Sequence, residues 1–479
     1  MVFDKKMLSS VMRGVIRVEE EDDWFCFTRF LPGQADAYRK DPNLYMKVPA
    51  TSGVSMAVRT DASKLSFHYR VTPASSRSFY DFTLLVNGKK YAQFGKKLHT
   101  DEGDCVFSLP EGEKEVEVFL PCLCKTELKD ISVDGNVTAL PKQPKLLFLG
   151  DSITQGYDSL CSADCYPTRV CAALGFEQLN QGIAAAKFDP DTIEWIPEFV
   201  PDRIVVAFGT NDWNQGVPHF RETVESYFAR LHETFGETPV WAITPIWRAD
   251  GDRVTAVGTF EDAIRIIEET CAAYPNLTVV DGGRIFPHDK AFLGDGRLHP
   301  SAEGFAFYAE GLLRAMEGAA PVKVIDGANR AETVSRVREA SRGVILRDGK
   351  LLVSHDVAMD MLMTPGGGKE QGESDEACCA REVEEETGLV VRVGKEFLTL
   401  IEYYGDVRYV THYFACEPTG TGEKHLTELE AERGLRPEWL APEAFLDAVS
   451  KHADFAETNE EKRGLYLREF EAMKAFLEK

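Results

Sequence analysis

Residues 145–156 read KLLFLGDSITQG, an apolar run of strand length that leads directly into Gly150, Asp151 and Ser152. Short apolar segments then alternate with amphipathic ones as far as residue 318. This alternation predicts a parallel sheet with helices on both faces. Ligands of such sheets bind at the carboxyl ends of the strands, so Ser152 stands where a site is expected. The expected strands are 145–150, 203–209, 239–245 and 277–282, and the expected helices are 219–236, 260–274 and 300–316.

The segment before this one has a different rhythm. Residues 1–143 read as short strands with alternating apolar and polar positions, and Asn87-Gly88 between two of them is a strong hairpin signal. No helical periodicity of useful length is apparent there. The pattern predicts an antiparallel β-sandwich or jelly roll as an accessory domain. The expected strands include 54–60, 64–71, 81–94 and 114–121.

A third domain is expected after the parallel sheet. With 479 residues and roughly 150 residues per domain, the chain has room for about three domains. Residues 144–318 form the second of these, 319–335 have the small, Pro- and Gly-containing composition of a linker, and 336–479 form the third. The third begins with strands in 343–355, followed by a helix at 374–387, a hairpin near residue 405 and a terminal helix. The sequence therefore predicts a multidomain protein: a β-sandwich, an α/β domain with a parallel sheet, and a third domain that contains both strands and helices.

The composition of the chain indicates which classes of partner and which cell compartment to expect. Asp and Glu number 78 against 54 Lys and Arg, which gives a net charge of -24 and argues against nucleic acid as a partner. Eleven cysteines without a CxxC pair are typical of reduced thiols in a reducing compartment. No segment reaches the ~18 apolar residues of a membrane helix, and residues 1–23 lack a signal-peptide core. We expect a cytoplasmic protein with no membrane partner, and its oligomeric state is not indicated.

Polar residues at the expected strand ends have the types that acyl transfer requires. A serine hydroxyl needs a base to remove its proton, and His299 is the candidate base for Ser152, with Asp295 to orient it. The tetrahedral transition state needs donors aimed at its oxyanion. The backbone N–H groups of Ser152 and Gly182 and the side-chain amide of Asn211 are the candidate donors.

These blocks resemble the SGNH (GDSL-type) hydrolases, an esterase family with an α/β/α fold and no cofactor. The Ser, Gly, Asn and His of that family correspond to Ser152, Gly182, Asn211 and His299. The usual acid lies three residues before the His, at Gly296, whereas Asp295 lies four before. Either the loop bulges so that Asp295 reaches the imidazole, or the site works largely as a Ser-His dyad.

The sandwich adds a suggestion about the substrate. Residues 1–143 are similar to the jelly roll that precedes the catalytic domain of SGNH carbohydrate esterases. This similarity implies removal of an acetyl group from a sugar or glycoside. The alternative is lysophospholipase or thioesterase activity.

Residues 366–389, GGGKEQGESDEACCAREVEEETGL, carry carboxylates in helical register. Glu382, Glu385 and Glu386 stand at i, i+3 and i+4, so a helix places them on one side. Like charges so close repel one another unless a cation lies among them. Oxygen-only ligands suit a hard ion such as Mg²⁺ or Mn²⁺. Ser374 is a fitting N-cap for this helix and Gly388 a fitting stop.

This segment resembles the Nudix box, G-x5-E-x7-R-E-U-x-E-E-x-G-U, at every fixed position. The matching residues are Gly367, Glu373, Arg381, Glu382, Val383, Glu385, Glu386, Gly388 and Leu389. The resemblance implies an α/β/α sandwich that hydrolyses a nucleoside diphosphate linked to a moiety X. It also implies metal ligation by Glu382, Glu385 and Glu386, with Glu373 and Arg381 as orienting partners.

Two readings of the third domain remain open. In one, the chain is a bifunctional hydrolase that acts on two small molecules, an acylated sugar and a nucleoside diphosphate derivative. In the other, the Nudix module senses a nucleotide without cleaving it and regulates the esterase. Many Nudix enzymes use a further Glu outside the box, for which Glu428 and Glu430 are candidates, with a slight preference for Glu430.

Overall fold

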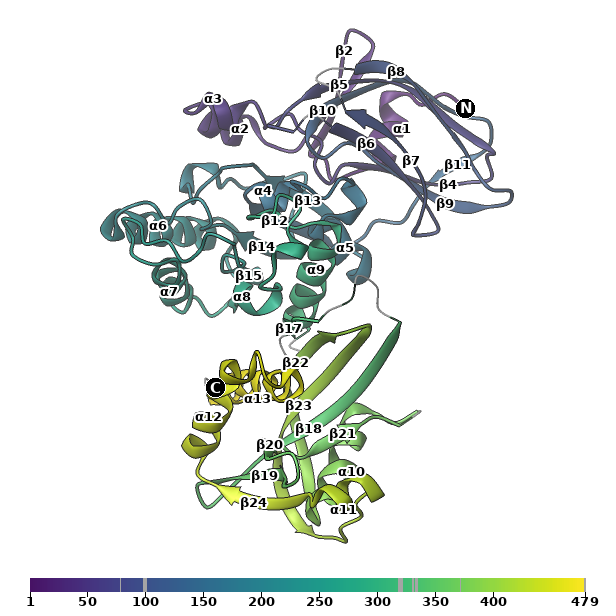
Figure 1. Cartoon of the computed structure of the whole chain (residues 1–479). Helices are drawn as coiled ribbons and strands as arrows, with labels where there is room; N and C mark the ends of the chain where they lie inside the picture. Colours follow the sequence, from purple (N-terminus) through teal and green to yellow (C-terminus); the bar gives the residue numbers. More distant parts are fainter. Residues whose placement is uncertain are drawn as a thin grey trace. The chain divides into compact units, whose positions relative to one another are not determined.

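The computed structural model describes residues 1–77, 79–97, 101–317, 322–329, 331, 335–370 and 372–477, and these divide into two compact units (Figure 1). Unit 1 comprises Met1–Ile285 and Asp289–Leu313. Unit 2 comprises Phe286–His288 and Arg314–Lys479.

The first part of unit 1 is the predicted antiparallel sandwich. Alternating side chains of both sheets fill one core that includes Phe67, Phe82 and Leu128. Asn87 and Gly88 turn the chain between two strands with φ of 49° and 74°, as the hairpin prediction requires. One sheet has the order β1 (Met12–Arg13), β4 (Ser55–Thr60), β9 (Lys114–Phe119), β6 (Phe79–Val86) and β7 (Lys89–Lys97), with β11 (Val137–Ala139) beside β4. The other has the order β2 (Arg17–Glu21), β3 (Trp24–Thr28), β10 (Cys124–Val133), β5 (Lys64–Pro73) and β8 (Asp101–Ser108).

Three short helices in this part were not predicted: α1 (Lys5–Val11), α2 (Pro32–Tyr38) and α3 (Pro42–Tyr45). Their lengths of 4 to 7 residues are below what a hydrophobic period can reveal. Tyr38 of α2 and the preceding Phe30 belong to the core of the parallel sheet rather than to that of the sandwich. The sandwich and the parallel sheet share one compact unit, and the segment around α2 packs on the core of the parallel sheet.

The second part of unit 1 is the predicted parallel sheet. Its order is β13 (Glu177–Gly182), β12 (Lys145–Gly150), β14 (Arg203–Ala207), β15 (Val240–Ile243) and β16 (Leu277–Val280). The order reverses at β12, which lies between β13 and β14, so the carboxyl end of β12 is the switch point where such sheets bind ligands. The helices are α4 (Ser152–Gln155), α5 (Tyr166–Leu174), α6 (Val217–Phe235), α7 (Phe260–Cys271), α8 (Gly282–Ile285) and α9 (Ala302–Met316), with 3₁₀ turns at Ser162–Asp164, Pro190–Thr192 and Lys290–Phe292.

Unit 2 is a mixed sheet between helices. Its path runs β17 (Val322–Asp326), β22 (Leu389–Tyr404), β23 (Val407–Thr421), β18 (Arg336–Arg347), β19 (Lys350–Asp356) and β20 (Met361–Met363), with β21 (Gly366–Gly368) beside β18 and β24 (Arg436–Leu440) beside β19. The helices are α10 (Asp375–Thr387), α11 (Glu428–Arg433), α12 (Pro442–Ser450) and α13 (Glu460–Leu477), with a 3₁₀ turn at Lys451–Phe455.

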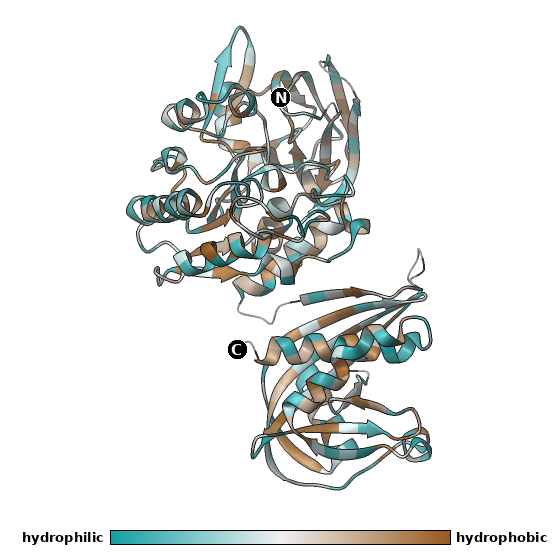
Figure 2. Ribbon diagram, turned by 60° about the vertical axis from the view of Figure 1, so that its left-hand side comes forward, coloured by the Kyte–Doolittle hydropathy of each residue, from teal (hydrophilic) through white to brown (hydrophobic). Residues whose placement is uncertain are grey.

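The two faces of this sheet are covered by different helices. Val344 and Tyr413 pack in the core that includes α12 and α13, whereas their neighbours Ile345 and Phe414 pack in the core that includes α10. Successive side chains of a strand point to opposite faces, so α10 and α13 lie on opposite sides. In Figure 2 the helix that ends at the C label carries both teal and brown segments, so hydrophilic and hydrophobic residues are mixed along it. The α/β/α prediction for this domain is confirmed.

The predicted linker, 319–335, is only partly a connection. Within it, β17 pairs in parallel with β22 and extends the sheet of unit 2. Residues 319–321, 330 and 332–334 lie outside the described residues. All eleven cysteines are free thiols, and no helix among the described residues is long and apolar enough to cross a membrane.

Candidate active sites

Ser152 is held at the end of β12 by the two residues that precede it, Gly150 and Asp151. A Cβ on Gly150 would lie 2.1 Å from Thr154 Oγ1 and 2.9 Å from the Ala207 carbonyl, so only glycine fits at the strand end. Asp151 caps α4 by accepting from the backbone N–H of Ile153 at 2.9 Å. Ser152 is thereby placed at the first residue of the helix, where it is 4% exposed.

His299 lies between Ser152 and Asp295 within hydrogen-bonding distance of both. Its Nε2 is 2.9 Å from Ser152 Oγ, and its Nδ1 is 2.7 Å from Asp295 Oδ2. Asp295 Oδ1 accepts from the backbone N–H groups of Arg297, Leu298 and His299 itself. Gly296, at φ 67°, allows the tight turn that this pattern needs. The loop therefore does bulge, and Asp295 reaches the imidazole although it lies one residue earlier than the usual position.

The protonation states fit proton transfer from serine. Burial raises the pKa of the Asp295 carboxyl, but the backbone N–H groups of Leu298 and Arg297, together with His299, outweigh burial and hold that pKa well below its usual range. Burial lowers the pKa of His299 against the opposing effect of the Asp295 carboxylate. An ionised aspartate beside a neutral imidazole is the combination that lets Nε2 accept the serine proton.

The oxyanion donors differ from the sequence-based expectation. The N–H of Gly182 donates to Asn180 Oδ1 at 2.9 Å, so it is not free to bind an oxyanion, and the assignment of Gly182 is corrected. Ala185, three residues later, is exposed at φ 68°, and its N–H has no hydrogen-bond acceptor within the described parts of the chain. Asn211 Nδ2 donates to the adjacent Ala186 carbonyl at 3.0 Å, which holds the amide beside Ala185.

Ala185 was missed because its residue type gives no signal. A positive φ is expected of glycine and of asparagine or aspartate, not of the middle residue in an Ala-Ala-Ala run. The neighbouring N–H of Ala184 is fixed by Gln155 Oε1 of α4 at 2.7 Å, so the run lies against the helix that carries Ser152. The structure therefore offers the Ser152 and Ala185 N–H groups and the Asn211 amide as donors.

A second carboxylate also approaches His299. Asp158 Oδ2 lies 3.5 Å from His299 Nδ1 and forms an ion pair with Arg77 of the sandwich. Asp158, Asp295 and His299 offer ligand atoms within 4.8 Å of one another, a spacing that a metal site also shows. Asp295 already accepts from three backbone N–H groups, and Asp158 is paired with Arg77. These contacts account for the cluster without a metal ion. Sequence reasoning missed Asp158 and Arg77, because neither belongs to a motif.

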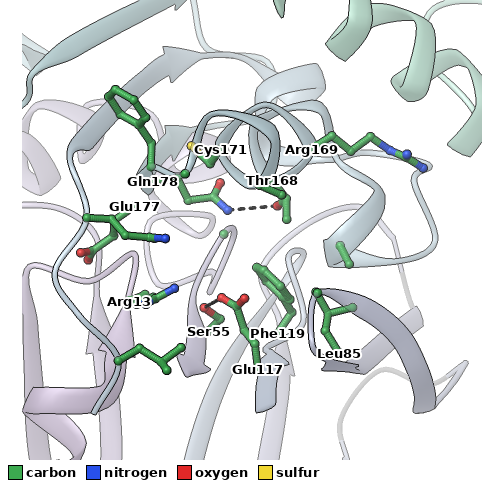
Figure 3. Close-up of a pocket in the computed structure, with 18 of the residues that line it drawn as sticks. Arg13, Ser55, Leu85, Glu117, Phe119, Thr168, Arg169, Cys171, Glu177 and Gln178 are labelled. Carbon is green, nitrogen blue, oxygen red and sulfur yellow. Dashed lines mark hydrogen bonds between the residues drawn. The ribbon is translucent and has the colours of Figure 1, made fainter. Parts of the chain in front are cut away.

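A cavity of about 650 Å³ lies elsewhere in unit 1, between sandwich strands and β13 (Figure 3). Arg13, Glu117, Glu177 and Gln178 line it, and burial raises the pKa of both glutamates. Ser152 and His299 do not line it. Hydrogen-bond geometry therefore identifies the serine site better than cavity size does.

In unit 2 the predicted carboxylate helix is α10. Ser374 Oγ caps it by accepting from Ala377 N at 3.1 Å, and Gly388 ends it at φ 71°, so both terminal predictions are confirmed. Glycines of β21 come close to the helix: a Cβ on Gly367 would lie 2.3 Å from a carboxylate oxygen of Glu382. The glycine-rich approach thus lets backbone lie against the carboxylates.

Arg381 links three of the predicted carboxylates. Its guanidinium forms a two-pronged contact with Glu373, at 2.9 and 3.0 Å, and also donates to Glu382 and Glu385 at 2.9 Å each. These contacts hold the pKa of Glu373 below its usual range. Glu373 and Arg381, which the Nudix resemblance implies as orienting partners, thus form an ion pair.

Glu386 is held apart from the other two carboxylates. It is 5% exposed and accepts from Ser354 Oγ at 2.5 Å and from Gly366 N at 3.3 Å. Burial raises its pKa to about 7, and burial also raises the pKa of Glu382. Within the described residues, Glu382, Glu385 and Glu386 do not bring their ligand atoms within 4.8 Å of one another. The helix thus carries three carboxylates, and burial disfavours the charged form of two of them, Glu382 and Glu386. Such an oxygen donor set suits a hard divalent cation.

The two candidate glutamates outside the box lie on α11. Glu430 accepts from Thr427 N at 2.8 Å as part of a capping box, and its charge raises the pKa of Glu382, so it lies near the box. Glu428 is exposed in the first turn of the same helix. Position therefore favours Glu430 over Glu428.

Two families match the chain by sequence. The GDSL-like Lipase/Acylhydrolase family matches residues 148–307, and the NUDIX domain matches residues 337–458. A comparison with curated proteins finds no match.

Solved structures share the fold of unit 1. The salicylyl-acyltransferase SsfX3 from a tetracycline biosynthetic pathway is similar at 20% identity and TM-score 0.55, over 64% of this chain and 94% of that one. A putative GDSL-like lipase from Bacteroides ovatus is similar at 17% identity and TM-score 0.55, over 66% and 97% of the two chains. A family two carbohydrate esterase from Cellvibrio japonicus matches at 15% identity and TM-score 0.49, over 65% and 96%; a similarity at this level indicates no substrate. The chain is therefore a multidomain hydrolase with a GDSL-like lipase/acylhydrolase domain at residues 148–307 and a NUDIX domain at residues 337–458.

Proposed function

We propose that unit 1 is a serine ester hydrolase in which Ser152, His299 and Asp295 form the catalytic triad. The observation that carries this proposal is the continuous contact from Asp295 through His299 to Ser152, at 2.7 and 2.9 Å. Nucleophile, base and orienting acid lie in the order that acyl transfer requires.

The residues supply each step of the reaction. His299 Nε2 takes the proton as Ser152 Oγ attacks the ester carbonyl, and the new imidazolium is stabilised by Asp295. The N–H groups of Ser152 and Ala185 and the amide of Asn211 receive the developing oxyanion. His299 then returns the proton to the leaving alcohol. Water, activated by the same base, hydrolyses the acyl-serine.

The substrate we propose is a small acyl ester, an acetyl group on a sugar or glycoside. Its support is the sandwich at residues 1–143, which resembles the module that precedes carbohydrate-esterase domains. The test measures hydrolysis of p-nitrophenyl acetate, p-nitrophenyl octanoate and acetylated sugars by the full chain and by its Ser152→Ala variant. We expect acetate to be favoured and Ser152→Ala to be inactive. Preferential turnover of octanoate would instead indicate the thioesterase or lysophospholipase class.

For unit 2 we propose Mg²⁺-dependent hydrolysis of a nucleoside diphosphate linked to a moiety X. Glu382, Glu385 and Glu386 would hold Mg²⁺ or Mn²⁺. The ion would supply charge neutralisation for the pyrophosphate and a lowered pKa for the attacking water. Arg381 and Glu373 orient the helix carboxylates through their ion pair, and Glu430 is the candidate for a further acid or base outside the box.

Sensing without cleavage is the competing function of this unit. The complete Nudix box favours catalysis over sensing, because nucleotide binding alone would not require three carboxylates close together on one helix. A screen of nucleoside diphosphate compounds with Mg²⁺, followed by phosphatase and phosphate detection, tests this. Turnover that Glu386→Gln abolishes supports the enzyme. Nucleotide binding without turnover supports sensing.

A further inference from the structure

The sandwich reaches into the proposed esterase site through the loop between β5 and β6. We propose that Arg77 of this loop is a positioning residue: it holds Asp158 and Tyr157 against His299 and balances the second negative charge beside that imidazole. This inference rests on the proposed function, in which His299 is the general base. It assigns to the sandwich a part in the chemistry of the neighbouring domain.

Negative charge is in excess at His299. One carboxylate, Asp295, suffices to orient the imidazole, yet Asp158 Oδ2 also lies 3.5 Å from Nδ1. The Asp158 side chain is only 15% exposed, so water screens its charge poorly. A second unbalanced carboxylate would favour the imidazolium form, which cannot accept the proton of Ser152.

Arg77 removes this imbalance. Its Nε donates to Asp158 Oδ1 at 2.8 Å and its Nη2 donates to Oδ2 at 2.5 Å, the planar fork that fits a carboxylate. The loop that carries it is fixed, because Arg77 N donates to Ser75 Oγ at 3.0 Å and Ala74 N donates to the Leu123 carbonyl at 3.1 Å. The cation is therefore supplied by the sandwich and not by the domain that contains the triad.

The same loop also holds Tyr157, whose aromatic ring lies beside His299. The guanidinium carbon of Arg77 lies 5.0 Å from the ring centroid of Tyr157, and that ring lies 5.2 Å from the ring of His299. Tyr157 OH accepts from the backbone N–H of Ser76 at 3.2 Å. Tyr157 is 3% exposed, so the loop and the imidazole enclose it. Arg77 thus fixes both residues that touch His299 from this side.

The groups that face His299 are Asp295 on its own loop, Ser152 on α4, Asp158 and Tyr157 after α4, and Arg77 from the sandwich. Burial lowers the pKa of His299, Asp295 and Asp158 raise it, and Arg77 lowers it. Removing Arg77 should raise this pKa, because burial is then opposed by two carboxylates and aided by no cation. Removing the Asp158 charge should lower it.

The experiment follows the His299 imidazole by NMR titration of the full chain labelled at histidine, with the signal identified by its loss in His299→Gln. Arg77→Gln should raise the midpoint by about one pH unit, and Asp158→Asn should lower it. The double variant should return toward the wild-type midpoint. Arg77→Lys, which keeps the charge but not the fork, should lie between wild type and Arg77→Gln. Arg59→Gln is the matched control, since Arg59 pairs with exposed Glu115 on the sandwich.

Ester hydrolysis gives the second readout. Below the raised midpoint, kcat of Arg77→Gln should fall about tenfold for every pH unit by which the midpoint has risen, while KM stays unchanged, because the proposal has Arg77 act through His299 and not on the substrate. If Arg77→Gln fails to fold, Asp158→Asn carries the test alone. Midpoints that stay within about 0.2 pH of wild type in both single variants, or that move in the same direction, would overturn the proposal. If wild type hydrolyses no ester while the midpoints move as expected, the ester-hydrolase proposal fails and the positioning of His299 stands.

Discussion

The two candidate sites differ in how their reactive groups are held. In unit 1 the nucleophile, base and acid are joined by hydrogen bonds of 2.7 and 2.9 Å. In unit 2 the carboxylates are divided between two partners: Arg381 holds Glu382 and Glu385, whereas Glu386 lies apart on Ser354. Complementary donors and acceptors can assemble without a ligand, whereas like charges need a cation before they converge. Under the proposed functions, the first site is therefore preformed, and a divalent ion would complete the second.

The largest expected effect separates the two sites outright. Ser152→Ala should lower ester hydrolysis by at least about 10⁴-fold, because the attacking atom is gone. Nucleotide hydrolysis in unit 2 should be unchanged. Both rates are measured on the same preparation, with Ser132→Ala, a sandwich serine paired with Ser66, as the control. Substantial ester hydrolysis in Ser152→Ala would show that another residue is the nucleophile.

The next effect concerns the acid of the preformed site. Asp295→Asn should lower kcat by roughly 10³-fold, because the amide favours the wrong tautomer of His299. The measurement is steady-state hydrolysis of p-nitrophenyl acetate. A loss below about tenfold would indicate that the site works as a Ser-His dyad despite the 2.7 Å contact.

The carboxylate site should respond to charge and metal together. Glu386→Gln, or removal of Mg²⁺ with EDTA, should lower nucleotide hydrolysis by roughly 10²-fold or more, because the donor set loses a ligand or its ion. Ester hydrolysis should not respond to either change. The control is Glu376→Gln, an exposed carboxylate in the first turn of α10. Loss of ester hydrolysis in Glu386→Gln would show that the two units are coupled.

The smallest effect tests the corrected oxyanion donor. Ala185→Gly should raise the free energy of unfolding of unit 1 by about 0.5–1 kcal/mol, because glycine adopts φ 68° without strain. Ester hydrolysis should be retained, since the N–H remains. Urea denaturation measures the change. A loss of stability would contradict the left-handed backbone at Ala185.

Much of the fold was predictable because its signals are periodic. The strand at 145–150 and the helix at 374–387 were found from apolar period and capping residues, and both are confirmed. The short helices α1 to α3 were not predicted because, at 4 to 7 residues, they are too short to show an amphipathic repeat. Part of the expected linker is β17, whose pairing with β22 comes from distant residues.

The sites were predictable only where residue type determines the role. Ser152, His299 and Asp295 were identified from their chemistry, and the structure brings them together. Ala185 could not be found, because a backbone N–H belongs to every residue type except proline. Arg77 could not be found either, because a salt bridge across 81 positions of the chain has no sequence pattern.

The most direct measurement is a pair of crystal structures of the full chain, with and without Mg²⁺, after reaction with a phosphonate ester. We predict phosphorus on Ser152 Oγ with its oxygen facing Ala185 N in both crystals, and convergence of Glu382, Glu385 and Glu386 on an ion only in the crystal that contains Mg²⁺. An unreacted Ser152, or a Glu386 that stays apart from Glu382 and Glu385 with no ion bound at millimolar Mg²⁺, would contradict the distinction between a preformed site and one completed by metal.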